Sequence, residues 1–135
     1  MKSKHLKAYM NCAEAFAECS TATRLKVGTV IVRDNNIIAT GYNGNPKHID
    51  GACEDENGVT LPTVRHSEMN ALMALIRSGQ SSVGATLICT HGCCKKCAID
   101  VVDSGITKVI YKYEYKNSDG IKYLKENGVV VYKLE

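Results

Sequence analysis

The fold class is decided by residues 85–111, ATLICTHGCCKKCAIDVVDSGITKVIY. The stretch begins with an apolar strand at 85–90 and continues with a helix at 94–104, which Gly105 ends. A second apolar strand follows at 108–111. Because a strand–helix–strand crossover is right-handed and pairs its two strands in parallel, this stretch predicts an α/β fold.

The rest of the chain predicts three more strands and three more helices. Turn residues 34–36 separate two β-branched runs, which is typical of an antiparallel hairpin. The predicted strands are 27–32, 37–40 and 129–132, and the predicted helices are 6–19, 67–76 and 119–126. The apolar positions expected to be buried in the middle helix are Met69, Leu72, Met73 and Ile76. These elements predict a three-layer α/β/α fold, in which helices cover both faces of a mixed five-stranded sheet.

Composition limits the class of protein. A chain of 135 residues with 44% hydrophobic content suits one globular domain, which we expect to span residues 1–135. The net charge of +3 comes from scattered Lys and Arg, so we expect no nucleic-acid partner. The polar start lacks the apolar region of a leader, and no apolar run is long enough to span a membrane. We therefore expect a cytoplasmic protein without a membrane partner.

Seven cysteines are many for this length, and in the cytosol clustered cysteines more often bind metal than form disulfides. Cys94 and Cys97 have the Cys-x-x-Cys spacing that lets two sulfurs reach one zinc ion, and they open a predicted helix. His66 opens another helix, and with both sulfurs it makes three ligands, which leaves a fourth position for water. Glu68 lies two residues beyond His66, where it can act as a proton carrier.

The same residues leave other interpretations open. Cys93 precedes Cys94 directly and could replace it as the sulfur donor. His91 and Cys93 could also close the site as further ligands, which would make the zinc structural, and a Cys-x-x-Cys pair can be a redox pair instead. His48 and Cys53 could hold a second, structural zinc ion.

These motifs resemble those of a known enzyme superfamily. A His-x-Glu motif followed by Pro-Cys-x-x-Cys is the signature of zinc nucleobase deaminases, and this chain matches it with Cys93 in place of proline. Further similar stretches are TRLKVGTVIV at 23–32, GYNGNP at 41–46, VIYKYEY at 109–115 and residues 120–131. Over nearly its whole length the chain resembles the cytidine and deoxycytidylate deaminase superfamily, and within it the deoxycytidylate (dCMP) deaminases.

The resemblance implies hydrolytic deamination of dCMP to dUMP with release of ammonia, a step in the supply of dTTP precursors. It implies that His66, Cys94 and Cys97 hold a catalytic Zn²⁺ and that Glu68 moves protons. The implied substrate contacts are Asn43 to the deoxyribose hydroxyl, the backbone of Ser67 to the exocyclic amine, Tyr115 beside the nucleotide, and Arg24 or Lys26 to phosphate.

The resemblance also implies regulation and assembly. Family members are typically homohexamers that dCTP activates and dTTP inhibits, and Mg²⁺ would accompany such a nucleoside triphosphate. The residues implied in effector binding are Gly41, Tyr42, Asn43 and Gly44.

Two other classes of function stay open at this point. One is another deaminase of the same fold, acting on tRNA adenosine, free cytidine or guanine. The other is a non-catalytic, zinc-stabilised module that binds nucleic acid, which would show a closed four-ligand site and salt-dependent binding of oligonucleotides.

Overall fold

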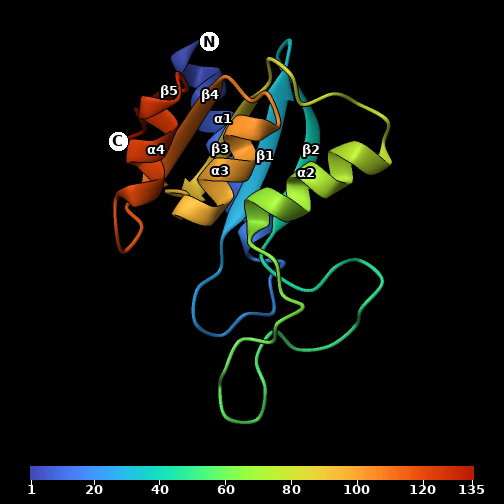
Figure 1. Cartoon of the computed structure of the whole chain (residues 1–135). Helices are drawn as coiled ribbons and strands as arrows, with labels where there is room; N and C mark the ends of the chain where they lie inside the picture. The colour runs from blue at the N-terminus through green and yellow to red at the C-terminus, as the bar shows by residue number, and fades with distance from the viewer.

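The computed structural model describes residues 1–135 and contains one mixed sheet with the strand order β2-β1-β3-β4-β5 (Figure 1). The strands are β1 Gly28–Arg33, β2 Asn36–Tyr42, β3 Thr86–His91, β4 Lys108–Tyr113 and β5 Val130–Lys133. β1 pairs antiparallel with β2 and with β3, whereas β4 pairs parallel with β3 and with β5. The prediction of a mixed five-stranded sheet, with an early hairpin and a parallel C-terminal part, is confirmed.

The hairpin between β1 and β2 turns on two residues with positive φ, Asp34 at 50° and Asn35 at 62°. A two-residue turn of this kind matches the right-handed twist of the strands that it joins. Asp and Asn tolerate this backbone region better than other side chains do, which explains why the turn forms here.

The helices are α1 Ser3–Ala17, α2 Ser67–Arg77, α3 Lys95–Asp103 and α4 Asp119–Glu126. Met10 and Ala13 of α1 pack with Ile88 of β3 on one face of the sheet. Leu75 of α2 and Leu124 of α4 belong to the larger core cluster on the opposite face, together with residues of α3. The predicted three layers are therefore present. None of the four helices combines the length and the apolar character that a membrane span requires.

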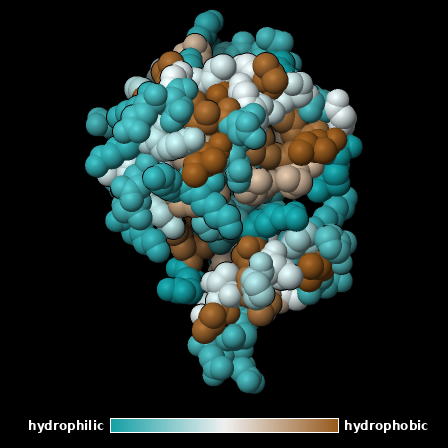
Figure 2. Space-filling view, in the orientation of Figure 1, coloured by the Kyte–Doolittle hydropathy of each residue, from teal (hydrophilic) through white to brown (hydrophobic).

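The buried face of α2 differs from the predicted stripe. Ile76 is 65% exposed, whereas the helix buries residues 67, 68, 71, 72 and 75. The prediction for Ile76 was wrong because the small Ala71 and the carboxylate of Glu68 occupy the inner face, so the helix is rotated relative to its most apolar side chains. On the surface seen in Figure 2, hydrophobic residues form small patches separated by hydrophilic ones.

The segment between β2 and α2 contains no helix or strand, as predicted for a long loop. Two isolated bridges shape it, one between Gly44 and Arg65 and one between Glu54 and Thr60. In Figure 1 this loop extends away from the sheet, on the side where α2 begins. It therefore lies next to the ends of the elements that carry the two motifs.

Candidate metal centre and pocket

Three side chains meet where α2 and α3 begin. The ligand atoms of His66, Cys94 and Cys97 all lie within 4.8 Å of one another. Nδ1 of His66 is 3.4 Å from Sγ of Cys94 and 3.2 Å from Sγ of Cys97. One imidazole and two sulfurs at this spacing fit a zinc ion, which takes nitrogen and thiolate ligands in tetrahedral geometry.

Helix starts set this geometry. His66 is the N-cap of α2, and Cys94 is the N-cap of α3, where its sulfur accepts a hydrogen bond from the backbone N–H of Cys97. The pKa of Cys94 is lowered to about 4 because its thiolate accepts a hydrogen bond from the thiol of Cys97 and because His66 lies beside it. The same bond raises the pKa of Cys97, and contact with Cys94 raises the pKa of His66. A thiolate is thus favoured at the position where a metal ligand must be deprotonated.

The two residues considered as further ligands lie outside this group. Cys93 is fully buried, and burial raises the pKa of its thiol, which keeps the proton on. Nδ1 of His91 is 2.8 Å from the hydroxyl of Thr90. No fourth His, Cys, Asp or Glu joins the group of three. His48 and Cys53 form no such group either: His48 is exposed, and Cys53 Sγ is 3.3 Å from the hydroxyl of Thr21.

Glu68 lies beside the metal group in a buried polar network. The residue is only 3% exposed, and its Oε1 accepts a hydrogen bond of 2.8 Å from the Ser67 hydroxyl. The hydroxyl of Ser67 in turn is 2.7 Å from that of Thr29 on β1. Because a buried carboxylate is costly without such partners, this network fixes the orientation of Glu68.

A cavity of about 400 Å³ opens over the metal group and Glu68. Its walls come from five parts of the chain: the segment before β1, the long loop, the start of α2, the end of β3 with the segment that follows it, and the segment after β4. Residues predicted as site members that line it are Arg24, Asn43, His66, Ser67, Glu68, Cys94 and Tyr115. The cavity therefore lies beyond the carboxyl ends of the parallel strands, where open α/β sheets place their ligands.

Other predicted contacts lie elsewhere. Lys26 is outside the cavity wall, with its ammonium 3.9 Å from the carboxylate of Glu18, because it faces the C-terminal end of α1. Gly41 is buried, and a Cβ there would lie 2.6 Å from the carbonyl oxygen of Ser67, so this glycine allows β2 and α2 to approach closely. Gly44 exchanges two backbone hydrogen bonds with Arg65, and Tyr42 is exposed.

The cavity is also lined by residues that sequence reasoning did not propose as substrate contacts. Lys116 and Glu54 line it, and so does His91, whose pKa is lowered by burial. The position of His91 at the end of a predicted strand was a usable signal, because strand ends carry ligand sites in this fold class. Lys116 and Glu54 belong to no motif, and only the fold brings them to the cavity.

Gly120 of α4 lies directly against the backbone of Cys93 and Cys94. We expect Gly120→Ala to weaken zinc binding at least about tenfold, as loss of supporting contacts does in metal sites. A Cβ at this position would lie 2.1 Å from the carbonyl oxygen of Cys93 and 2.7 Å from the carbonyl carbon of Cys94. Zinc affinity, measured by competition with a chromophoric chelator, checks this. Lys122→Ala on the exposed side of α4 is the control. Because Gly→Ala normally favours a helix by about 1 kcal/mol, unchanged zinc affinity together with higher stability would contradict the assignment.

Comparison with known proteins places this site in a family. Residues 3–113 match the model of the cytidine and deoxycytidylate deaminase zinc-binding region. The chain is 36% identical to the deoxycytidylate deaminase of Saccharomyces cerevisiae, over 91% of this chain and 42% of that protein. It is 35% identical to ComE operon protein 2 of Bacillus subtilis, over 94% of this chain and 69% of that protein. The chain thus spans less than half the length of the yeast relative.

A solved structure is also similar. The crystal structure of the dCMP deaminase from the cyanophage S-TIM5, in complex with dCMP and dUMP, superposes with a TM-score of 0.94 at 41% identity and covers 99% of both chains. The matched family region contains all three members of the His/Cys/Cys group, which supports zinc as its metal. By its family match, its fold and the residues at this centre, the chain belongs to the cytidine and deoxycytidylate deaminase family.

Proposed function

We propose that residues 1–135 form one catalytic domain that hydrolyses dCMP to dUMP and ammonia. The observation that carries this proposal is the buried carboxylate of Glu68 beside the group of His66, Cys94 and Cys97, with Glu68, His66 and Cys94 lining one cavity. The similarity to a dCMP deaminase solved with dCMP and dUMP over 99% of both chains supports the choice of substrate.

His66, Cys94 and Cys97 would hold the zinc ion. When bound with three protein ligands, zinc supplies Lewis acidity at its fourth position and lowers the pKa of water there toward ~7. The nitrogen and sulfur donor set matches this metal, and it leaves the proton transfers to a neighbouring side chain.

Glu68 is the proton carrier of the proposed reaction. It accepts a proton from the attacking water and passes it to N3 of the cytosine ring, and it then carries the proton of the new C4 hydroxyl to the amine that leaves C4. The C4–N bond breaks, a C4 carbonyl remains and ammonia departs, so one water molecule is consumed for each ammonia released. The hydroxyl of Ser67 holds Oε1 of Glu68, and the backbone of Ser67 would contact the exocyclic amine.

Two cations support recognition of the 5′-phosphate. Arg24 and Lys116 both line the cavity, and neither forms an ion pair within the chain. Besides Glu68, the cavity wall contains two acidic residues with partners of their own: Glu54 accepts a hydrogen bond from the backbone of Thr23, and Glu114 pairs with Lys133. Arg24 and Lys116 are therefore the two cations of the cavity wall that no carboxylate pairs, and unpaired cations suit a phosphate.

We expect Arg24→Ala and Lys116→Ala each to raise the KM for dCMP about tenfold or more, with a smaller change in kcat, because each removes a charge-assisted contact that substrate and transition state share. Steady-state ammonia release over a range of dCMP concentrations measures both constants. Lys26→Ala removes a cation two residues from Arg24 that lies beside Glu18 and outside the cavity wall. The KM of this variant for dCMP should stay within about twofold of the unmodified value. If all three variants behaved alike, the phosphate assignment would be wrong.

For the rest of the nucleotide we propose Asn43 at the deoxyribose hydroxyl and Tyr115 beside the base. Both line the cavity, and burial raises the pKa of Tyr115, which keeps its hydroxyl protonated as a donor. One amide N–H and one lone pair of Asn43 are free of the hydrogen bonds that this side chain makes to the backbone.

Regulation is a separate part of the proposal. We propose a homohexamer that dCTP with Mg²⁺ activates and dTTP inhibits, on the basis of the family resemblance. The exposed ring of Tyr42 next to the Gly44–Arg65 bridge offers a contact for such an effector on the loop that borders the cavity. Activity at subsaturating dCMP, with and without each triphosphate, tests this separately from catalysis.

The experiment that tests the main proposal is an ammonia-release assay with dCMP, cytidine and a tRNA anticodon loop, each with and without a chelator. Chelator-sensitive turnover of dCMP, with little turnover of the other two, is the expected result. Turnover of the anticodon loop or of cytidine, without turnover of dCMP, would point to another deaminase of this fold. Salt-dependent binding of oligonucleotides without any turnover would point to a non-catalytic module.

A further inference from the structure

The wall of the cavity that carries Arg24 is an irregular segment between α1 and β1. Four of its residues line the cavity: Ala22, Arg24, Leu25 and Val27. Because the segment belongs to no helix or strand, its backbone conformation depends on contacts made by side chains.

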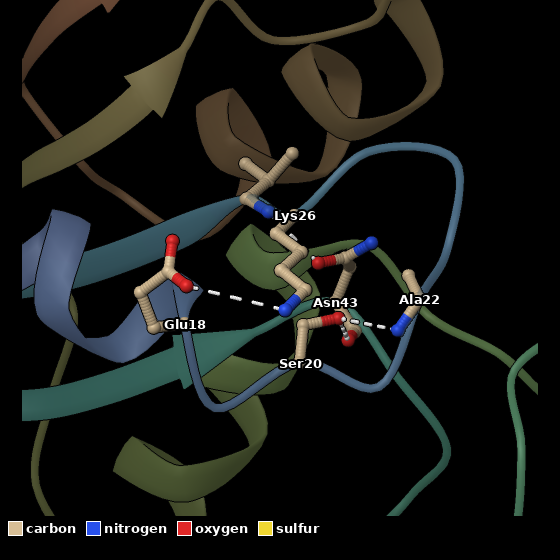
Figure 3. Close-up of polar contacts among 6 residues, drawn as sticks. Glu18, Ser20, Ala22, Lys26 and Asn43 are labelled. Carbon is tan, nitrogen blue, oxygen red and sulfur yellow. Dashed lines mark hydrogen bonds and ion pairs between the residues drawn. The ribbon is translucent and has the colours of Figure 1, made fainter.

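Two side chains hold this wall, those of Ser20 and Asn43 (Figure 3). The hydroxyl of Ser20 donates to the carbonyl oxygen of Asn43 at 2.7 Å and accepts from the backbone N–H of Ala22 at 3.1 Å. The amide of Asn43 accepts from the N–H of Val27 at 2.9 Å and donates to the carbonyl oxygen of Leu25 at 2.7 Å.

The first of these contacts is sheltered from water. Ser20 is only 3% exposed and Ala22 is buried. A hydroxyl that both donates and accepts in a buried position leaves two backbone groups unpaired when it is removed, which costs more than an exposed hydrogen bond. Ser20 itself is absent from the cavity lining, so it acts on a ligand only through the wall.

We propose that Ser20 is a positioning residue for recognition of the substrate phosphate. Its hydroxyl ties the Ala22 end of the wall to the strand end at Asn43 and so presents the unpaired cation of Arg24 to the cavity in one orientation. The inference rests on the proposed function, because it takes a nucleoside monophosphate as substrate. Such a contact would preorganise the site, because an arginine on a fixed backbone loses less conformational freedom when phosphate binds.

Asn43 is the less informative residue to substitute. Its amide both holds the wall and faces the cavity, so a loss of activity in an Asn43 variant would not separate a direct contact from a positioning role. Ser20 has only the second role, which makes it the better probe.

The test compares dCMP with deoxycytidine, which lacks the phosphate. For Ser20→Ala we expect kcat/KM on dCMP to fall about tenfold, mainly through KM, while kcat/KM on deoxycytidine changes less than about twofold. Because kcat/KM is a second-order constant, the slow substrate can be measured at high enzyme concentration without saturation. A purely structural role would lower both values together, and that outcome would overturn the proposal.

A double-mutant cycle tests whether Ser20 acts on phosphate recognition through Arg24. If Ser20 acts through Arg24, then adding Ser20→Ala to Arg24→Ala should lower the preference for dCMP over deoxycytidine only a little further. Additive losses would overturn the route. Ser20→Thr, which keeps the hydroxyl, should retain most of the preference, and Cys19→Ser is the matched control on the exposed neighbouring position.

The same experiment separates the two proposals. If the unmodified protein turns over neither dCMP nor deoxycytidine, the proposed function fails. If it turns over dCMP and Ser20→Ala leaves the ratio of the two kcat/KM values unchanged, only the positioning role of Ser20 fails.

Discussion

Glu68→Gln is expected to keep its zinc and to lose activity on dCMP by about 10²- to 10⁴-fold in kcat, the range that a positioned proton carrier contributes. Glutamine has nearly the same shape, and its side-chain oxygen can still accept the 2.8 Å hydrogen bond from Ser67. What it lacks is the ability to take a proton from water. The loss should therefore be in the chemical step, with the KM for dCMP little changed.

Zinc content by atomic absorption and steady-state ammonia release check this result together. Glu54→Gln is an instructive comparison, because it neutralises a second carboxylate of the same cavity that only holds the backbone of Thr23. Its kcat should change less than about tenfold. Near-normal kcat for Glu68→Gln would remove the proton carrier from the proposed mechanism.

The second large effect is expected at the sulfur ligands. Cys94→Ala and Cys97→Ala should each lose tightly bound zinc, and with it all measurable turnover, because two protein ligands are too few to hold the ion with an open catalytic position. Each sulfur is within 3.4 Å of Nδ1 of His66, so either substitution breaks the same group. Zinc retained after dialysis against a chelator, and the visible spectrum of the cobalt form, measure the loss.

Cys93→Ala is the matched control. Cys93 precedes Cys94 directly and was the alternative sulfur donor on sequence grounds, but its thiol is fully buried and lies outside the metal group. The variant should keep one zinc per chain, with some loss of stability from the space left by the sulfur. If Cys93→Ala lost the metal and Cys94→Ala kept it, the ligand register would be shifted by one residue.

Much of the candidate site could be predicted from short motifs. His66 and Glu68 are two residues apart and Cys94 and Cys97 three, and in each case the motif lies where a helix begins. At a helix start the first turn fixes the relative directions of nearby side chains, so spacing carries geometric information. Only the fact that His66 and Cys94, 28 residues apart in the chain, lie side by side depended on the fold.

Other predictions depended on features that no motif carries. Ile76 was wrongly placed in the core because apolar spacing does not reveal which side of a helix a buried carboxylate occupies. Arg24 and Lys26 were alternative candidates for the phosphate contact on sequence grounds, yet only Arg24 lines the cavity. Side chains in an irregular segment follow its local backbone path, and here hydrogen bonds from backbone N–H groups to the side chains of Ser20 and Asn43 set that path.

The amino-acid sequence by itself determined the α/β class and predicted the candidate metal ligands and proton carrier, because alternation of elements and ligand spacing are local properties of a chain. The tertiary structure alone decided which cations face the cavity, that Thr29 and Ser67 orient Glu68, and that Ser20 holds the wall of Arg24. These residues come from segments far apart in the chain. Their approach depends on strand order and on close packing at positions such as Gly41 and Gly120, which no local pattern encodes.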